Sequence, residues 1–214
     1  MDTRIEERLK AGVQALGLSL DAAQIAALLA YLALLVKWNR AYNLTAVRDP
    51  LDMVDKHLLD SLAVLPWIDD TPLADVGCGP GLPGIVIAIC RPSLPVTLID
   101  SNLKMLRFAQ MAVRELRLGA VESWRGRVEQ WEVPGNFGQV ISRAFASLPD
   151  FLKLAGHLCR PDGRLLAMKG RLSPDELGGL PAGYVLEAAH ALHVPGLHAE
   201  RHLVLVRPLM DTPL

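Results

Sequence analysis

The chain has 214 residues, a formal net charge of −1 and a composition that is 51% hydrophobic. This length and composition favour a globular protein with a substantial buried core, and the near-zero charge excludes a strong overall attraction to nucleic acid. Neither a membrane span nor a secretion signal is expected. The longest apolar run, residues 25–36, falls short of the about 20 residues that a span needs, and the first ten residues are charged.

The three cysteines are widely spaced, at Cys78, Cys90 and Cys159, and form neither a disulfide framework nor a metal site. The sequence therefore predicts a metal-free protein of the reducing cytoplasm. Residues 100–171 hold 12 basic and 7 acidic side chains. That local excess is compatible with a basic face that contacts phosphates, and equally with a mixed, solvated surface.

The first 65 residues carry helical patterns. Asp21, with Gln24 three residues later, resembles a capping box, and apolar side chains then recur on one helical face as far as Val36. We predict that this helix ends near residues 38–40 and that a shorter helix over residues 51–65 is stopped by Pro66. Residues 1–65 are therefore predicted to form an N-terminal helical extension.

From residue 66 onward, predicted strands and helices alternate. Strands are predicted at residues 73–76, 96–99 and 120–124, from residue 140, and at residues 163–168 after a turn at Pro161-Asp162-Gly163. Helices are predicted at residues 85–90, at 103–116 with Gly119 just past the end, and at 148–158. Residues 184–193 and 202–206 are two further strands around a Pro195-Gly196 turn. The pattern predicts an α/β domain over residues 66–214, with a mostly parallel, doubly wound sheet and an antiparallel C-terminal hairpin.

A glycine-rich loop at residues 75–84 follows the first of these strands and precedes a helix. Gly77, Gly79 and Gly81 allow a tight turn and let a ligand approach the backbone closely. Asp100 ends the next strand, where a carboxylate can accept hydrogen bonds from both ribose hydroxyls of an adenosine group. The loop also satisfies the dinucleotide fingerprint, so both NAD and S-adenosylmethionine are candidate cofactors.

Three features favour S-adenosylmethionine. Asp75 stands on the strand just before the glycines, where methyltransferases place an acid near the amino group of the cofactor. Pro80 and Pro83 remove backbone donors that a pyrophosphate would need. Only about 130 residues follow the loop, and they contain no Tyr-x-x-x-Lys dehydrogenase pair. An NAD-dependent oxidoreductase and a purely structural glycine turn remain alternatives, whereas a P-loop is excluded because its motif is absent.

The sequence lacks two signatures of nucleobase methylation. Residues 141–146 stand where adenine amino-methylases carry Asn/Asp-Pro-Pro-Tyr, and the three cysteines are expected to be structural, so a cytosine C5 nucleophile is missing. Guanine N7 already has an exposed lone pair and needs no deprotonation, which suits a site without a general base. Arg143 follows the fourth strand and could hydrogen-bond a guanine edge or the cofactor carboxylate, or form a surface ion pair.

Several motifs, in order, match one known family. The matching segments are residues 38–45 (WNRAYNLT), 57–61 (HLLDS), 75–84, 142–146 (SRAFA), 169–170 (KG) and 200–202 (ERH). Together they span most of the chain, which resembles the ribosomal small-subunit methyltransferase G family, also called glucose-inhibited division protein B. The resemblance implies a Rossmann-like class I methyltransferase that transfers a methyl group from S-adenosylmethionine to N7 of guanine 527 in 16S rRNA. It also implies 16S rRNA or the small ribosomal subunit as partner, without membrane or metal, and we expect a monomer.

The resemblance carries cofactor contacts onto particular positions. From the family come Gly77, Leu82, Val128, Glu129 and Arg143. The other expected cofactor-binding residues are Asp75, Gly79 and Gly81, which follow from the glycine loop itself, and Asp100, which is placed by its strand position. Cys78 departs from relatives, which often carry Thr or Ser there, although a small side chain is kept.

The remaining matches point to the methyl acceptor. Arg143, Asn43 and Lys169 are the expected catalytic residues, and Lys169, Arg201 and His202 the expected RNA contacts. Asn43 and Thr45 either shape the acceptor pocket or close a turn. His57 and Asp60 are as compatible with a helix-surface pair as with a site, and Trp38 is expected in the core. A catalytically inactive rRNA-binding module stays open as a further alternative.

Overall fold

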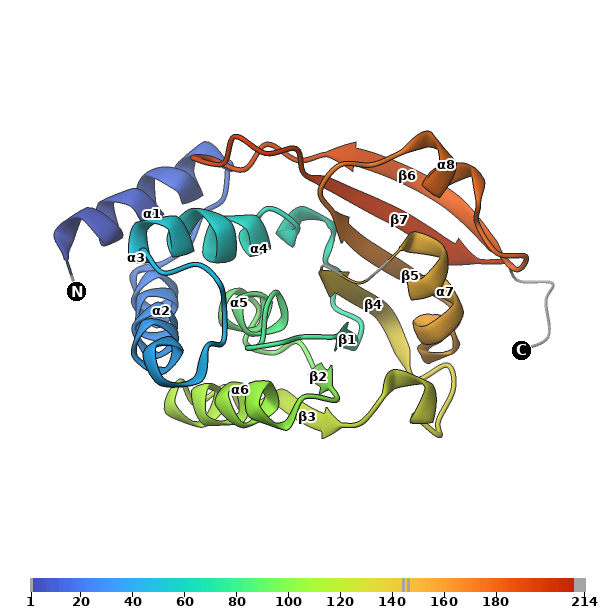
Figure 1. Cartoon of the computed structure of the whole chain (residues 1–214), viewed down its shortest axis with the longest axis horizontal. Helices are drawn as coiled ribbons and strands as arrows, with labels where there is room; N and C mark the ends of the chain where they lie inside the picture. Colours follow the sequence, from blue (N-terminus) through green and yellow to red (C-terminus); the bar gives the residue numbers. More distant parts are fainter. Residues whose placement is uncertain (1, 144, 146, 210–214) are drawn as a thin grey trace.

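The computed structural model describes residues 2–143, 145 and 147–209. A seven-stranded sheet in the order β3-β2-β1-β4-β5-β7-β6 forms the centre of the molecule (Figure 1). Strands β1 to β5 run parallel to one another, and β7 runs antiparallel to both β5 and β6. The predicted mostly parallel α/β sheet and the antiparallel C-terminal hairpin are both confirmed.

The bounds of the elements agree closely with the predicted alternation. The strands are β1 Leu73–Val76, β2 Val96–Asp100, β3 Val121–Arg125, β4 Phe137–Arg143, β5 Cys159–Lys169, β6 Tyr184–Ala191 and β7 His202–Pro208. The helices between them are α5 Gly84–Cys90, α6 Leu103–Glu115, α7 Leu148–Ala155 with the 3-10 turn η4 Gly156–Leu158, and α8 Pro174–Gly178. Strands β1, β2 and β4 are mostly buried, as expected for the centre of a sheet covered on both faces, whereas β3 at the edge is half-exposed.

Two local predictions are wrong. The turn expected at Pro161-Asp162-Gly163 lies inside β5, where the pairing with β4 slips between Phe137 and Gln139. A bulge leaves residues unpaired, so it tolerates a proline that lacks an N–H. Helix α6 also ends without Gly119: Arg117 takes the left-handed conformation (φ 55°) instead, and the N–H of Leu118 closes the helix end on Val113 O.

The N-terminal extension begins with two helices, α1 Thr3–Ala15 and α2 Ala22–Tyr42. The capping box of Asp21 and Gln24 is confirmed, and α2 runs two residues beyond the predicted end because Asn43 accepts a left-handed backbone as its C-cap. Among the described residues, α2 is the one helix long and apolar enough to cross a membrane by length and composition. Its inner face, however, is buried in the protein core.

The second helical segment is a continuous run with an irregular middle. It comprises α3 Pro50–Met53, the π-helical η1 Val54–Leu59, α4 Asp60–Leu62 and the 3-10 turn η2 Leu65–Trp67. Pro66 lies within the closing 3-10 turn, so α4 ends before the proline rather than at it. Short π-helical segments are often found at functional sites, and this one contains His57 and immediately precedes Asp60.

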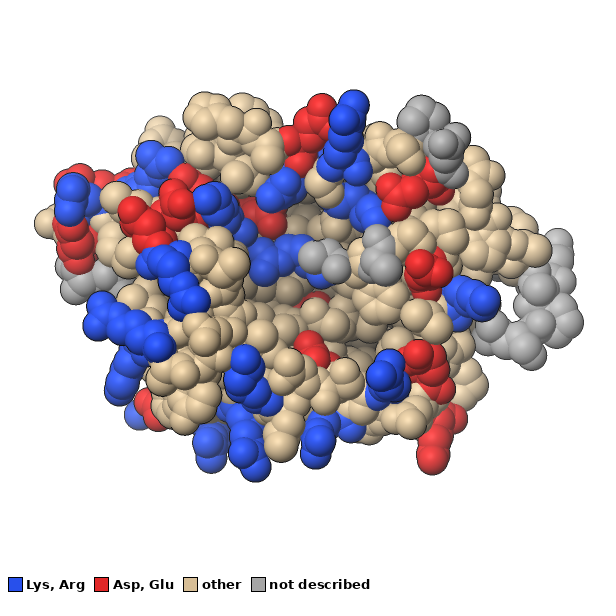
Figure 2. All heavy atoms as spheres, viewed as in Figure 1, with Lys and Arg blue, Asp and Glu red and all other residues tan. Residues whose placement is uncertain are grey.

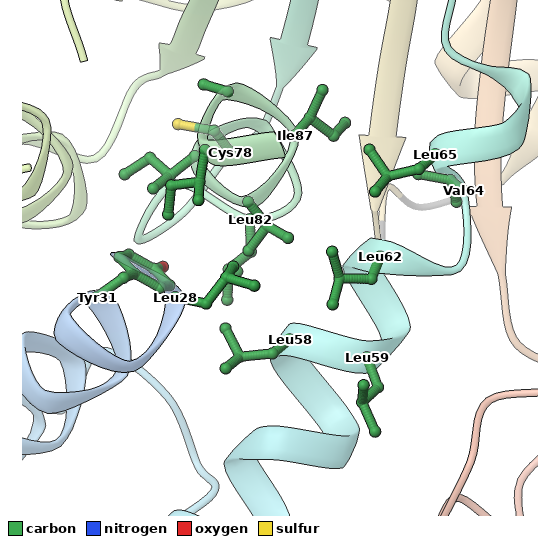
Figure 3. Close-up of a cluster of buried hydrophobic side chains, with 14 of the residues drawn as sticks. Leu28, Tyr31, Leu58, Leu59, Leu62, Val64, Leu65, Cys78, Leu82 and Ile87 are labelled. Atoms are coloured by element: carbon green, nitrogen blue, oxygen red, sulfur yellow. The ribbon is translucent and has the colours of Figure 1, made fainter. Parts of the chain in front are cut away.

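One hydrophobic cluster joins the extension to the sheet domain. Figure 3 shows Leu28 and Tyr31 of α2, Leu58 and Leu62 of the second segment, and Leu82 of the glycine loop converging. All five side chains are at most 2% exposed, and burial of each leucine stabilises the fold by about 2 kcal/mol. The extension is therefore packed directly against the loop that the sequence singled out, while the domain boundary at residue 65 stays a prediction.

Candidate functional site

The glycine loop is a tight turn at the carboxyl end of β1. Gly77, Gly79 and Gly81 have φ values of 68°, 54° and 97°, which disfavour any residue with a Cβ. Cys78 O accepts from the N–H groups of both Gly81 and Leu82, each at 2.9 Å, and these bonds close the turn. Gly77 is exposed at the start of the loop, so its backbone is open to a ligand.

Every N–H group of residues 77–85 that proline does not remove is already bonded within the protein. The acceptors are Ile99 O for Gly77 and Cys78, Asp100 Oδ2 for Gly79, Cys78 O for Gly81 and Leu82, Asp75 Oδ2 for Gly84, and Gly81 O for Ile85. A dinucleotide site needs free amides here for its pyrophosphate. This loop offers none, and two carboxylates lie against it.

Asp75 is fully buried in β1. Its Oδ2 accepts the Gly84 N–H at 2.7 Å, whereas its Oδ1 has no hydrogen-bond partner among the described residues. Burial raises the pKa of Asp75 to about 7, and the negative charge of Asp100 acts in the same direction, while the Gly84 bond and Arg143 oppose the shift. Asp75 has no exposed surface in this structure, and its contact with the amino group of a cofactor stays a prediction.

Asp100 connects the end of β2 to the glycine loop. Its two carboxylate oxygens accept the N–H groups of Gly79 at 2.8 Å and Asn102 at 2.7 Å. A carboxylate offers about four acceptor positions, so two remain for hydroxyl donors. On the β3 side, the 3-10 turn η3 Val128–Gln130 presents a buried Val128 and an exposed Glu129. These residues line the carboxyl edge of the sheet in the order that the sequence suggests.

Leu82 and Phe145 complete the surroundings of the loop. Leu82 is 2% exposed and packs into the core, which leaves little of its side chain for a ligand. Phe145 belongs to the matched SRAFA motif, but the sequence did not suggest a role for it. A Cβ placed on Gly77 would lie 3.8 Å from the edge of the Phe145 ring. Ala144 and Ala146 of the same predicted block lie outside the described residues. A flat aromatic ring is thus placed beside the open end of the loop.

A pocket of about 400 Å³ opens at the carboxyl ends of β4 and β5. It is lined by Val47, Lys56, His57, Asp60, Arg143, Met168, Lys169, Gly170 and Arg201. At its centre, the buried Asp60 carboxylate bonds Arg143 at 3.3 Å and Arg201 at 2.9 Å. Three separate chain segments therefore meet on one acidic side chain.

The pocket gathers most of the predicted acceptor residues. Arg143, Lys169 and Arg201 all line it, and Lys169 Nζ pairs with Glu176 at 2.7 Å. His202 lies outside this lining, where its Nδ1 bonds Gly170 O at 2.7 Å and fixes that backbone. Asn43 also lies outside it: its side chain is exposed and accepts from Arg48 at 2.6 Å. The structure therefore separates Asn43 from the other two expected catalytic residues.

His57 and Asp60 are both buried, so they do not form a pair on the helix surface, which was one of the two arrangements that the sequence left open. His57 Nδ1 lies 3.0 Å from Lys56 O, which can only accept, so this nitrogen carries the proton and Nε2 accepts from Thr45 Oγ1 at 2.9 Å. Burial lowers the pKa of His57 to about 4, and the positive charge of Arg143 acts in the same direction. A neutral His57 thus anchors the Thr45 turn to the pocket.

Asn39 supports the pocket from α2, a role that the sequence did not suggest. It is 2% exposed, its Oδ1 accepts the Thr45 N–H at 2.9 Å, and its Nδ2 donates to Val47 O at 3.0 Å. These bonds hold the turn whose Val47 lines the pocket. The signal was present: Asn39 lies four residues after Leu35 on the buried stripe of α2, where a polar side chain needs partners.

The pKa values of His57 and Asp75 predict opposite effects of pH on stability. His57 takes up a proton near pH 6.5 in the unfolded chain but only near pH 4 in the folded chain. The stability that neutral His57 contributes to the folded protein is therefore lost as pH falls from 6.5 to 4. The folded chain keeps Asp75 protonated up to about pH 7 while the unfolded chain ionises near 3.8, so its contribution is lost as pH rises. The free energy of unfolding changes by about 3 kcal/mol through His57 and by about 4 kcal/mol through Asp75. Because the two changes have opposite signs over nearly the same pH range, they largely cancel in the wild type.

Single substitutions are expected to reveal each contribution. Relative to the wild type, His57→Gln should gain stability as pH falls from 6.5 to 4, and Asp75→Asn should gain stability as pH rises from 4 to 7. Urea unfolding of the three proteins at half-unit pH intervals measures both differences. Stability differences that stay constant across this range would show that neither group titrates as the burial indicates.

The cysteines contribute no nucleophile to this site. All three are free thiols, and burial raises the pKa of Cys78 and brings those of Cys90 and Cys159 to about 12. A thiol is a nucleophile only as its thiolate, which these surroundings suppress. Cys78 sits in the glycine loop with its Sγ toward Gly79 O and packs into the core. Cys78 and Cys159 are buried and Cys90 is half-buried, so a structural role stays the prediction for all three.

Comparison with known proteins was made on sequence and on structure. The family model of rRNA small subunit methyltransferase G matches residues 24–204. Ribosomal RNA small subunit methyltransferase G of Xanthomonas euvesicatoria pv. vesicatoria is 52% identical over 203 residues, which cover 95% of each chain. The protein of the same description from Methylobacillus flagellatus is 51% identical over 205 residues, 94% of this chain and 98% of that one.

Solved structures support the fold. TrmN from Thermus thermophilus superposes with a TM-score of 0.58 at 21% identity, over 80% of this chain and 53% of that one. Geranyl diphosphate methyltransferase in complex with SAM gives a TM-score of 0.54 at 14% identity, over 70% and 85% of the two chains. Such identities show a shared methyltransferase fold and no more. The match over nearly the whole sequence goes further: this chain belongs to the rRNA small subunit methyltransferase G family.

Proposed function

We propose that this protein transfers a methyl group from S-adenosylmethionine to N7 of a guanine in 16S rRNA, at position 527, in the cytoplasm. The observation that carries the proposal is the pocket around Asp60, Arg143 and Arg201 beside the glycine loop, in a chain of this family. The relatives' description supplies the small-subunit rRNA. Guanine N7 and position 527 come from the family resemblance of the sequence, and a pocket without a free base is compatible with them.

The residues around the glycine loop fit S-adenosylmethionine. Asp100 keeps two acceptor positions for the ribose hydroxyls, and η3 with Val128 and Glu129 suits the adenine. The exposed Gly77 backbone beside Phe145 leaves room for the amino acid end. The bound amides of the loop argue against NAD, whose pyrophosphate they could not hold. Asp75 fixes the loop by accepting the Gly84 N–H.

The pocket suits a nucleophile that needs no base. S-adenosylmethionine would supply an electrophilic methyl group on a sulfonium centre. His57 is neutral and bonded at both ring nitrogens, and Asp60 is held by two arginines, so neither is free to take a proton. Guanine N7 attacks with its own lone pair, and the base gains positive charge without losing a proton.

The arginines and lysine around the pocket have distinct roles in this proposal. Arg143 offers guanidinium donors to the guanine edge, for which arginine is the commonest partner. Lys169 and Arg201 face the mouth of the same pocket and contact RNA phosphates, while His202 holds the Gly170 backbone between them. Asn43 is reassigned to closing α2, because it bonds Arg48 outside the pocket.

Two measurements test the proposal. Mass mapping of 16S rRNA from cells that lack the gene should show the N7 methyl missing at that guanine, and restored by the wild-type gene. Persistence of the methyl group in the deletion strain would falsify the assigned substrate. Isothermal titration should show binding of S-adenosylmethionine and none of NAD; the reverse would establish an oxidoreductase. RNA binding without transfer of a labelled methyl group would identify an inactive rRNA-binding module.

A further inference from the structure

A second concave surface lies outside the site described so far, between the end of α2 and the outer face of α6. This groove has a volume of about 650 Å³ and is lined by Trp38, Tyr42, Leu44, Leu103, Lys104, Arg107, Phe108, Gln110, Met111 and Arg114. None of its lining residues lines the pocket around Asp60, Arg143 and Arg201. The groove combines an apolar floor, an exposed aromatic ring and a positively charged rim.

The floor of the groove is apolar and firm. Leu44 and Phe108 are each 4% exposed and belong to the main hydrophobic cluster. Above them, Trp38 and Tyr42, one helical turn apart on α2, stack with ring centroids 5.3 Å apart and an interplanar angle of 24°. Tyr42 is 47% exposed, one of very few large apolar side chains that the described part of the chain leaves open to solvent. The groove therefore has a solvent-facing aromatic ring on a rigid support.

The rim of the groove is positively charged. Lys104, Arg107 and Arg114 project from one face of α6, at spacings of three and seven residues, and the residues that line the groove include no acid. None of the three cations has a carboxylate within 4 Å among the residues described. Figure 2 shows Lys and Arg gathered over the lower left of the molecule, where α2 and α6 lie in Figure 1.

We infer that this groove binds a single-stranded segment of the RNA substrate, with a base stacked on Tyr42 and phosphates on Lys104, Arg107 and Arg114. Aromatic rings beside unpaired cations are the usual means of holding unstacked bases, and a duplex hides the faces of its bases from such a ring. The concave shape disfavours a membrane surface, because the apolar floor lies below the charged rim instead of protruding. The inference rests on the proposed RNA substrate.

The groove also adjoins the cofactor region. Helix α6 begins after Asn102, whose N–H donates to Asp100, and Lys104 Nζ lies 3.4 Å from Asn43 O at the end of α2. A strand of RNA seated in the groove therefore leads toward the carboxyl edge of the sheet. Binding there would anchor the RNA beside the pocket without touching the methyl group.

Direct binding separates the two parts of the inference. The probe is a fluorescein-labelled, 12-nucleotide single-stranded RNA, measured by anisotropy at several salt concentrations. The triple change Lys104→Gln, Arg107→Gln and Arg114→Gln should weaken binding at least about tenfold and reduce the slope of log K against log salt by about two. Tyr42→Ala should weaken binding about tenfold with an unchanged slope, and Tyr42→Phe should bind as the wild type does.

Matched controls make the result specific. The triple change Lys10→Gln, Lys153→Gln and Arg207→Gln removes the same charge from exposed positions on α1, α7 and β7 and should leave Kd within about twofold. Equal losses in both triple variants, or no RNA binding by the wild type, would overturn the inference. So would tight binding to anionic phospholipid vesicles, or wild-type self-association in sedimentation that the groove variants abolish.

The same assay distinguishes this inference from the proposed function. The assay measures binding without methyl transfer. If the wild type binds RNA through the groove but does not methylate 16S rRNA, only the proposed function is contradicted. A wild type that methylates 16S rRNA, with groove variants that bind as tightly as it does, removes only the groove. With both intact, the groove variants should raise KM for the small subunit at least about fivefold while kcat stays within twofold.

Discussion

Replacing Arg143 by alanine is expected to lower kcat/KM for methyl transfer at least about 100-fold while the protein stays folded. Arg143 ends β4, its side chain is 20% exposed, and it donates to both Lys56 O and Asp60. Loss of a group that positions the acceptor base misplaces the reacting nitrogen, and a misplacement of about 1 Å costs about a factor of 100. Single-turnover methylation of small subunits, with circular dichroism as a check on folding, measures the effect.

Two variants establish that the effect belongs to the pocket. Arg164→Ala removes another arginine that makes two hydrogen bonds to one carboxylate, that of Glu187, but it joins β5 to the edge strand β6. It should retain activity within about twofold. Arg143→Lys keeps the positive charge but loses the planar guanidinium with its parallel donors. Its kcat/KM should lie between those of the wild type and Arg143→Ala. Wild-type activity in Arg143→Ala would remove this residue from the site.

Asp60 is expected to act through the arginines that it holds. Asp60→Asn keeps the size of the side chain while weakening the bonds to Arg143 and Arg201, so it should lower kcat more than it changes the affinity for S-adenosylmethionine. If Asp60 positions Arg143, the double variant with Arg143→Ala should be little worse than Arg143→Ala alone. Independent, additive losses would give Asp60 a separate role.

The elements around the site were predictable because their signals are local. The strand at Leu73–Val76, its glycine turn and the strand ending at Asp100 each show in a run of a few residues, through apolar alternation and turn residues. The parallel order then brings their carboxyl ends to one edge of the sheet. The position of Asp100 beside the loop followed from this rule, and Gly79 N–H bonds its carboxylate.

The centre of the acceptor pocket was not predictable in the same way. Asp60 lies 83 residues from Arg143 and 141 from Arg201 along the chain, and no local pattern indicates which acid will meet which arginine. The sequence also could not show that the Asp75 carboxylate is enclosed by its own loop and accepts the N–H of Gly84, nine residues later. Both arrangements depend on tertiary contacts, which no short stretch of sequence specifies.

Replacing Gly84 by alanine is expected to lower the free energy of unfolding by about 2–3 kcal/mol and the Tm by about 5–10 °C. A Cβ at this position would lie 2.5 Å from Leu98 Cδ2, 2.8 Å from Asp75 Oδ2 and 3.1 Å from Asp75 Cβ. Asp75 and Leu98 are fully buried in adjacent strands, so neither can move aside cheaply. The start of α5 must shift instead, which breaks the bond from Gly84 N–H to Asp75 and displaces the loop.

The displaced loop gives the prediction a second readout. Because the same backbone carries Gly77 to Gly81 toward the cofactor, Gly84→Ala should weaken S-adenosylmethionine binding at least about tenfold at a temperature where the variant remains folded. Gly119→Ala is the matched control: a Cβ there meets no atom within 4 Å, so stability should change by at most about 0.5 kcal/mol. If the two alanine variants unfold together and bind the cofactor alike, the contact between Gly84 and Asp75 does not shape the site.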